Sequence, residues 1–102
     1  MVVTIVERWT IRPERMSQID EFLKDLPKWR QFDESFGAKW LGIFVTLVGD
    51  SPFASYMAIF TMPDMATWER VYAELPRRMA EESKRWNEMT TDYSITMMQQ
   101  VL

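Results

Sequence analysis

Two adjacent charged residues, Glu7 and Arg8, interrupt a segment that is otherwise apolar and β-branched. A charge in the middle of a strand must be paired or must face a polar cavity, because burying an isolated ion costs several kcal/mol. We therefore expect one of the two to line a ligand pocket. Glu7 could act there as a general base with a pKa raised by burial, and Arg8 could anchor an anionic or enolate oxygen. The alternative is a structural ion pair or an exposed charge.

Aromatic side chains form the second group of candidate site residues. Trp9, Trp40, Phe44 and Tyr56 could make a wall that stacks a flat ligand, with the Tyr56 hydroxyl as a polar and catalytic contact. Core packing is the simpler role for any one of them, but as a set they favour a small aromatic or apolar ligand.

Two further aromatic residues are candidates near the C-terminal end. Tyr93 could supply a second phenolic acid or donor, since it lies where the last strand is expected to begin. Trp86 has the spacing of a helix core residue and could also close the mouth of the pocket.

The chain has no histidine and no cysteine. It therefore lacks the commonest general base, the usual zinc ligands and the proximal haem ligand. The adjacent acidic pairs Asp33-Glu34 and Glu81-Glu82 diverge on a helix, so we interpret them as solvated faces and not as metal sites. The sequence thus predicts neither a metal nor a cofactor.

The charge and hydropathy of the chain exclude some classes of binding partner. A net charge of −3 gives no basic patch for nucleic acid, whose phosphates need clustered Lys and Arg. No apolar run approaches the ~18 residues that span a bilayer, and no secretion signal is evident. We expect a cytoplasmic protein without a membrane or nucleic-acid partner.

The first half of the chain predicts a strand followed by a helix. Residues 2–11 are rich in β-branched and aromatic side chains, and their alternation places Glu7 on the face of Ile5 and Trp9 and Arg8 on the other. Apolar residues then recur at three- and four-residue steps up to Gly37, which is typical of an amphipathic helix. Pro27 should kink or divide it.

The second half predicts a hairpin, a broken helix and a closing strand. Residues 38–48 and 53–62 read as strands joined by a turn at residues 49–52. Asp64 has the position of a helix N-cap, Pro76 interrupts the helix that follows, and a second piece continues to about Met89. Residues 93–101 alternate as a final strand.

This βαββαβ order over residues 1–102, taken as a single domain, predicts an α+β fold. Right-handed crossovers give a four-stranded antiparallel sheet with the helices on one face. Both faces of the middle strands carry apolar side chains. One face should carry Leu41, Ile43, Val45 and Leu47, and the other should carry Trp40, Phe44 and Val48. The uncovered face would then exceed the apolar patch that monomers tolerate, so we expect a homodimer.

Several segments resemble a known family. The strand that ends at Arg12-Pro13, the stretch of residues 42–49, and residues 56–60 followed by residues 63–70 look like the NIPSNAP-like branch of the dimeric α/β barrel superfamily. The resemblance implies a pair of ferredoxin-like subunits with a ligand pocket between sheet and helices. Related sequences often carry His-Gly where this chain has Phe36-Gly37, which argues against a histidine-dependent role.

The resemblance leaves two functional hypotheses. The superfamily includes cofactor-free monooxygenases of aromatic polyketides, cyclases and isomerases, and this chain could be such an enzyme. The alternative is a non-catalytic ligand-binding or interaction protein of the NIPSNAP type. An open cavity containing Glu7 or Arg8 favours the enzyme, whereas a cavity filled by side chains favours the alternative.

Overall fold

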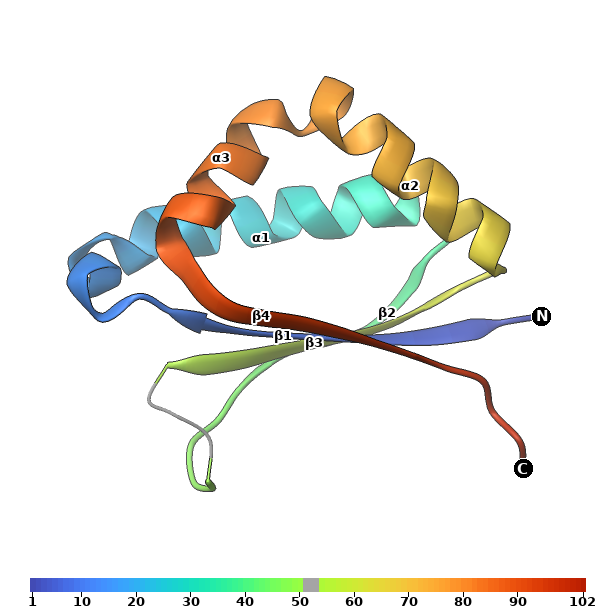
Figure 1. The fold of residues 1–102 in the computed structure, drawn as a ribbon, viewed down its shortest axis with the longest axis horizontal. Coiled ribbons are helices and arrows are strands. Elements are labelled where there is room, and N and C mark those ends of the chain that lie inside the picture. Colours follow the sequence, from blue (N-terminus) through green and yellow to red (C-terminus); the bar gives the residue numbers. More distant parts are fainter. Residues whose placement is uncertain (51–53) are drawn as a thin grey trace.

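The computed structural model describes residues 1–50 and 54–102. Four strands make one antiparallel sheet in the order β2-β3-β1-β4, and the helices lie together on one of its faces (Figure 1). This confirms the predicted α+β order and sheet. The elements are β1 (Val3–Ile11), a 3-10 helix η1 (Pro13–Gln18), α1 (Ile19–Glu34), β2 (Lys39–Val45), β3 (Ser55–Met62), α2 (Met65–Arg78), α3 (Ala80–Met89) and β4 (Thr90–Met98).

Strand β1 lies at the centre of the sheet and pairs with both β3 and β4. Its alternating pattern places Val3, Ile5, Trp9 and Ile11 under the helices, where all four are buried. Glu7 shares this parity, as predicted, and Arg8 points to the opposite face. A carboxylate is thereby positioned from one of the two inner strands toward the helix layer.

The two prolines lie inside helices, and the predicted break follows only the second of them. Pro27 lies within a continuous α1, so it does not divide that helix. Pro76 lies within α2, which ends two residues later before α3 begins at Ala80. The predicted N-cap is confirmed, because the Asp64 carboxylate accepts a hydrogen bond of 2.7 Å from the backbone N–H of Thr67.

A register shift in β2 corrects the predicted strand faces. Trp40 pairs with Phe60 and Gly42 pairs with Ile59, so Leu41 is an extra residue in a β-bulge. Because the bulge reverses the alternation, Trp40 faces the helices and its ring stacks 4.7 Å from Phe60. Phe44 faces the opposite side, and Trp40 and Phe44 therefore cannot belong to one aromatic wall as predicted.

The ends of the predicted hairpin and of the last strand also differ. Strand β2 ends at Val45, so Leu47 and Val48 belong to the connection and are almost fully exposed. The predicted turn at residues 49–52 lies partly outside the described residues. Strand β4 begins at Thr90 and ends at Met98, and Asp92 adopts a positive φ of 55° beside a register shift between Arg8 and Thr10.

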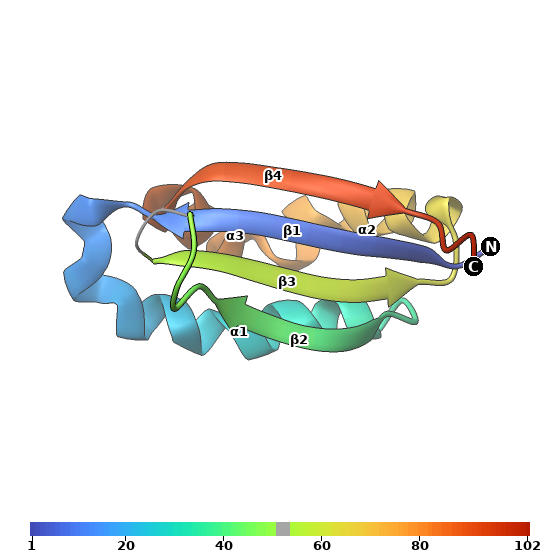
Figure 2. The same cartoon turned by 90° about the horizontal axis from the view of Figure 1, so that it is seen from below.

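The sheet face opposite the helices is not covered within the described residues, and Figure 2 looks onto it. Its centre is apolar, with Val6 and Ile59 directly paired, whereas Thr and Ser side chains occupy much of β1 and β4. Phe44 and Met98 on this face are 48% and 46% exposed. The face is thus less apolar than predicted, but it keeps a half-exposed apolar strip.

Candidate functional site

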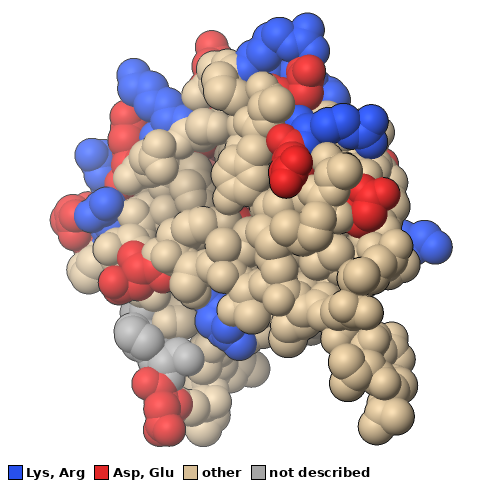
Figure 3. Space-filling model, turned by 45° about the vertical axis from the view of Figure 1, so that its right-hand side comes forward, with Lys and Arg blue, Asp and Glu red and all other residues tan. Residues whose placement is uncertain are grey.

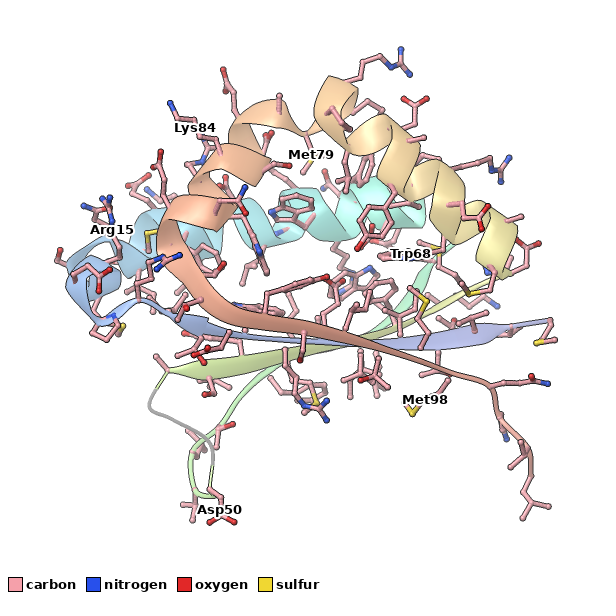
Figure 4. All side chains as sticks on the ribbon, viewed as in Figure 1. Arg15, Asp50, Trp68, Met79, Lys84 and Met98 are labelled. Carbon is pink, nitrogen blue, oxygen red and sulfur yellow. The ribbon has the colours of Figure 1, made fainter. Side chains whose placement is uncertain are left out.

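A cavity of about 570 Å³ lies between the sheet and the helix layer. Strands β1, β2, β3 and β4 supply its floor, and α1, α2 and α3 supply its walls and roof. All five tryptophans of the chain line it, namely Trp9, Trp29, Trp40, Trp68 and Trp86. A cavity of this size and lining suits a flat, drug-sized ligand. Figure 4 shows Trp68 reaching from α2 into the space above the sheet.

Glu7 projects into this cavity and is held by a tyrosine of the neighbouring strand. The Tyr93 hydroxyl donates a hydrogen bond of 2.6 Å to Glu7 Oε2. Burial raises the pKa of the Glu7 carboxyl, and the Tyr93 hydrogen bond lowers it by a smaller amount. The pKa of Tyr93 is raised by its burial and then by the charge of Glu7, so its proton stays on the phenol.

A second carboxyl, Asp33, faces the same cavity from the last turn of α1. It is only 6% exposed, and burial together with the charge of Glu7 raises its pKa to about 8. The prediction that Asp33 belongs to a solvated face is therefore wrong. The signal was present in the sequence, because Asp33 follows Leu26 and Trp29 at three- and four-residue steps on the apolar side of the helix.

Three indole N–H groups at the cavity are buried without a partner. The Nε1 atoms of Trp9, Trp40 and Trp68 have no hydrogen-bond acceptor among the described residues. An unpaired buried donor costs roughly 1–3 kcal/mol, which oxygen atoms of a bound ligand could recover. The aromatic walls therefore contain N–H donors that could bind acceptor atoms of a ligand. Neither Trp29 nor Trp68 was among the residues that the sequence predicted for the site.

Trp86 lies at the centre of the aromatic lining and not only at its mouth. Its ring centroid is 4.7 Å from that of Trp9, 5.9 Å from Trp29 and 6.0 Å from Tyr93. These tilted and edge-on contacts join α3 to β1, α1 and β4. They stiffen the wall that surrounds Glu7.

Three of the residues predicted for the site lie outside the cavity lining. Arg8 is exposed on the uncovered face of the sheet, and so is about half of Phe44. Tyr56 stacks on Trp9 with a centroid distance of 5.9 Å, behind the lining, and burial raises the pKa of its phenol. The structure therefore brings Glu7, Trp9, Trp40, Trp86 and Tyr93 together and separates Arg8, Phe44 and Tyr56 from them.

An ion pair ties the helices above the cavity to one another. Asp25 on α1 is 4% exposed and accepts hydrogen bonds of 2.6 and 3.0 Å from the Arg85 guanidinium on α3. The Arg85 hydrogen bond is the main reason why the pKa of Asp25 is lowered. This bidentate contact fixes the distance between the two helices that carry Trp29 and Trp86.

The remaining charges are distributed over the outside of the molecule. Lys, Arg, Asp and Glu are interspersed around the helix layer in Figure 3, with an uncharged surface between them. In the described ranges no cluster of three or more metal-binding side chains occurs. Nor does any described helix have the length and apolar character needed to cross a membrane.

The fold and the cavity together define the class: a ferredoxin-like α+β protein with a ligand-sized space between sheet and helices. No protein-family model and no curated protein matches the sequence. Solved structures with the same fold do match, and they include NIPSNAP family proteins, as the sequence resemblance predicted.

Three of these structures illustrate the likeness. A NIPSNAP family protein of Agrobacterium tumefaciens superposes with a TM-score of 0.77 at 11% identity, covering 99% of this chain and 94% of that one. A NIPSNAP-like domain protein of Burkholderia xenovorans gives 0.73 at 12%, covering 98% and 85%. SnoaB of Streptomyces nogalater, a cofactor-independent oxygenase, gives 0.70 at 16%, covering 99% and 94%. At these identities the likeness shows a shared fold.

Proposed function

We propose that this chain is a small cofactor-independent enzyme that acts on an aromatic or polyketide-like substrate. The observation that carries the proposal is the placement of Glu7, a hydrogen-bonded carboxyl with a raised pKa, inside an open cavity lined by five tryptophans. Because burial raises the pKa of this carboxyl, it is a stronger proton acceptor than an exposed glutamate, which favours proton abstraction. A cavity packed solid by side chains would have favoured a non-catalytic protein.

The first chemical step is removal of a proton from the substrate. Glu7 takes a proton from a carbon that is next to a carbonyl group or conjugated with it, and the electron pair of the broken C–H bond moves toward the carbonyl oxygen to form an enolate. Tyr93 orients the carboxylate through its hydrogen bond. The aromatic walls hold the ring system flat and exclude water, so that the carboxylate and the C–H bond stay aligned.

Three outcomes of this enolate are chemically accessible, and oxygenation is the one we favour. In oxygenation the enolate supplies the electrons that reduce O₂; one oxygen atom forms a new carbonyl, and the other leaves as water with two substrate hydrogens. Cyclisation and isomerisation use the same enolate without O₂. Support for oxygenation comes from the fold shared with SnoaB, which is described as a cofactor-independent oxygenase.

Anthrone is a suitable probe because it is flat and carries an acidic CH₂ group that is conjugated, through the fused aromatic rings, with the carbonyl on the opposite side of the central ring. We expect the protein to accelerate O₂ uptake and anthraquinone formation above the rate without protein. Glu7→Gln should remove most of this acceleration, about 10²-fold or more, since general base catalysis contributes that much. Glu88→Gln changes an exposed carboxylate outside the cavity lining and is the matched control.

Two results would contradict the proposal. Equal rates for the wild type and Glu7→Gln would remove Glu7 as the base. Tight binding of anthrone with no acceleration, and with no deuterium exchange at its CH₂ group above background, would favour a non-catalytic ligand-binding protein instead.

We also propose that the protein works as a homodimer, with the uncovered sheet face against a second copy. In Figure 1 residues 46–50, which follow β2, and the last residues of the chain form two arms that extend beyond the sheet on this side. They carry exposed apolar residues, Leu47 and Val48 on one arm and Val101 and Leu102 on the other. A second sheet seated between the arms would bury both sets. A cytoplasmic location is proposed on the sequence pattern alone.

A further inference from the structure

Two carboxyl groups share one cavity, and the proposed reaction uses only one of them. Glu7 enters from β1, and Asp33 enters from α1 on the opposite wall. They are close enough for the charge of Glu7 to raise the pKa of Asp33. Two carboxylates in a space of low polarity repel each other, so the pair is most stable when it keeps one proton.

The surroundings decide which carboxyl keeps that proton. Glu7 accepts the hydrogen bond from Tyr93, and this contact stabilises its ionised form. Asp33 has no such donor among the described residues, and it lies in the last turn of α1, where the negative end of the helix dipole disfavours a second negative charge. Glu7 is therefore the ionised member and Asp33 the protonated one.

We propose that Asp33 and Glu7 act as a pair that makes the cavity select uncharged planar ligands and reject anionic ones, with the Asp33 carboxylic acid donating a hydrogen bond to a ligand carbonyl. The Glu7 carboxylate repels a second negative charge in the same space. Asp33 is thus a specificity-determining residue. The inference concerns the cavity of the proposed enzyme, but it requires only binding and not turnover.

The other titratable groups of the cavity do not cancel this effect. Tyr72 and Tyr93 line the cavity from α2 and β4, and burial together with the charge of Glu7 raises the pKa of Tyr93, so that its phenol stays protonated. Arg12 and Asp92 carry opposite charges and belong to the same end of the β1 and β4 pair. The Glu7 charge therefore has no dedicated cation beside it among the described residues that line the cavity.

Two probe molecules of the same shape measure the effect of the ligand's charge alone. 1-Naphthamide and 1-naphthoate have the same shape, but the first is neutral and the second anionic. Calorimetric titration of the full chain at pH 7 should show naphthamide binding at least about tenfold more tightly than naphthoate, because a like charge in a cavity of reduced dielectric weakens binding by at least this factor.

The pH profile tests the role of Asp33 without any variant. Naphthamide stays neutral throughout, so its affinity should fall about tenfold between pH 7 and pH 9 as the Asp33 donor ionises around its pKa of about 8. Asp33→Asn keeps a donor that does not ionise and should flatten the profile. Glu34→Gln, the exposed neighbour on the same helix, should leave it unchanged.

The Glu7→Gln variant should change ligand binding in a way that a purely structural role of Glu7 would not predict. It should bring the affinities of naphthoate and naphthamide close together and move the naphthamide profile to lower pH, since Asp33 loses its negative neighbour. Failure of naphthamide to bind, equal affinities in the wild type, or a wild-type profile that is flat from pH 7 to pH 9 would each overturn the inference. Selective binding without anthrone turnover would uphold it and refute only the proposed enzyme.

Discussion

The Tyr93 hydroxyl donates a 2.6 Å hydrogen bond to Glu7 Oε2 across the pair of strands β1 and β4. The two residues are 86 positions apart in the sequence. Their contact depends on the register of the closing strand, which places Tyr93 on the helix side of the sheet beside the central strand.

Tyr93→Phe removes this donor and should raise the pKa of Glu7 further, because the hydrogen bond is the contact that lowers it. The acidic limb of the pH–rate profile for anthrone oxidation should therefore move to higher pH. Tyr56→Phe removes a phenol outside the cavity lining and should not move the limb. An unchanged limb in Tyr93→Phe would show that Glu7 is not the titrating base.

Asp33 should make stability depend on pH in a direction unusual for a carboxyl. Its folded pKa of about 8 lies far above the value of about 3.9 in unfolded chains, so the folded state binds more protons between these limits. Its contribution is therefore fully present below about pH 4 and is lost as pH rises toward 8. Asp33→Asn should be more stable than the wild type at pH 8.5, by roughly 2 kcal/mol.

Urea denaturation at pH 5 and pH 8.5 measures this difference. Glu34→Gln is the control, since that carboxylate is exposed and should change stability little at either pH. A stability difference between Asp33→Asn and the wild type that is the same at both pH values would contradict the raised pKa.

Asp25 and Arg85 should hold the helices over the cavity. Arg85→Ala leaves the buried Asp25 carboxylate without its bidentate partner and should lower the urea midpoint by about 1 M. Arg30→Ala breaks an exposed pair with Glu34 on the outside of α1 and should shift the midpoint far less. Equal shifts in the two variants would show that the inter-helix pair is no stronger than a surface contact.

A charge on the uncovered sheet face should break the dimer. Phe44→Glu places a carboxylate where we propose that a second copy packs, and sedimentation velocity at micromolar concentration should show the change from dimer to monomer. Leu23→Glu, at a similarly exposed apolar site on α1, should remain dimeric. A folded wild-type monomer at this concentration would refute the homodimer.

Local patterns in the sequence were sufficient for the order of the elements and for the side of the sheet on which Glu7 lies. Alternation along β1 depends only on the two-residue period of a strand, and the N-cap at Asp64 depends only on residues 64–67. Glu7, Trp9, Trp40, Trp86 and Tyr93 were all proposed from residue type and reached the cavity lining.

The tertiary structure alone decided which of these residues meet. A bulge at Leu41 reversed the alternation in β2 and separated Trp40 from Phe44, because one extra residue moves every later side chain to the other face. Asp33 became part of the site because α1 packs its C-terminal turn over the sheet, and its pKa depends on Glu7, which lies 26 residues earlier in the sequence. Burial and the proximity of charges arise between elements, so no local pattern could specify them.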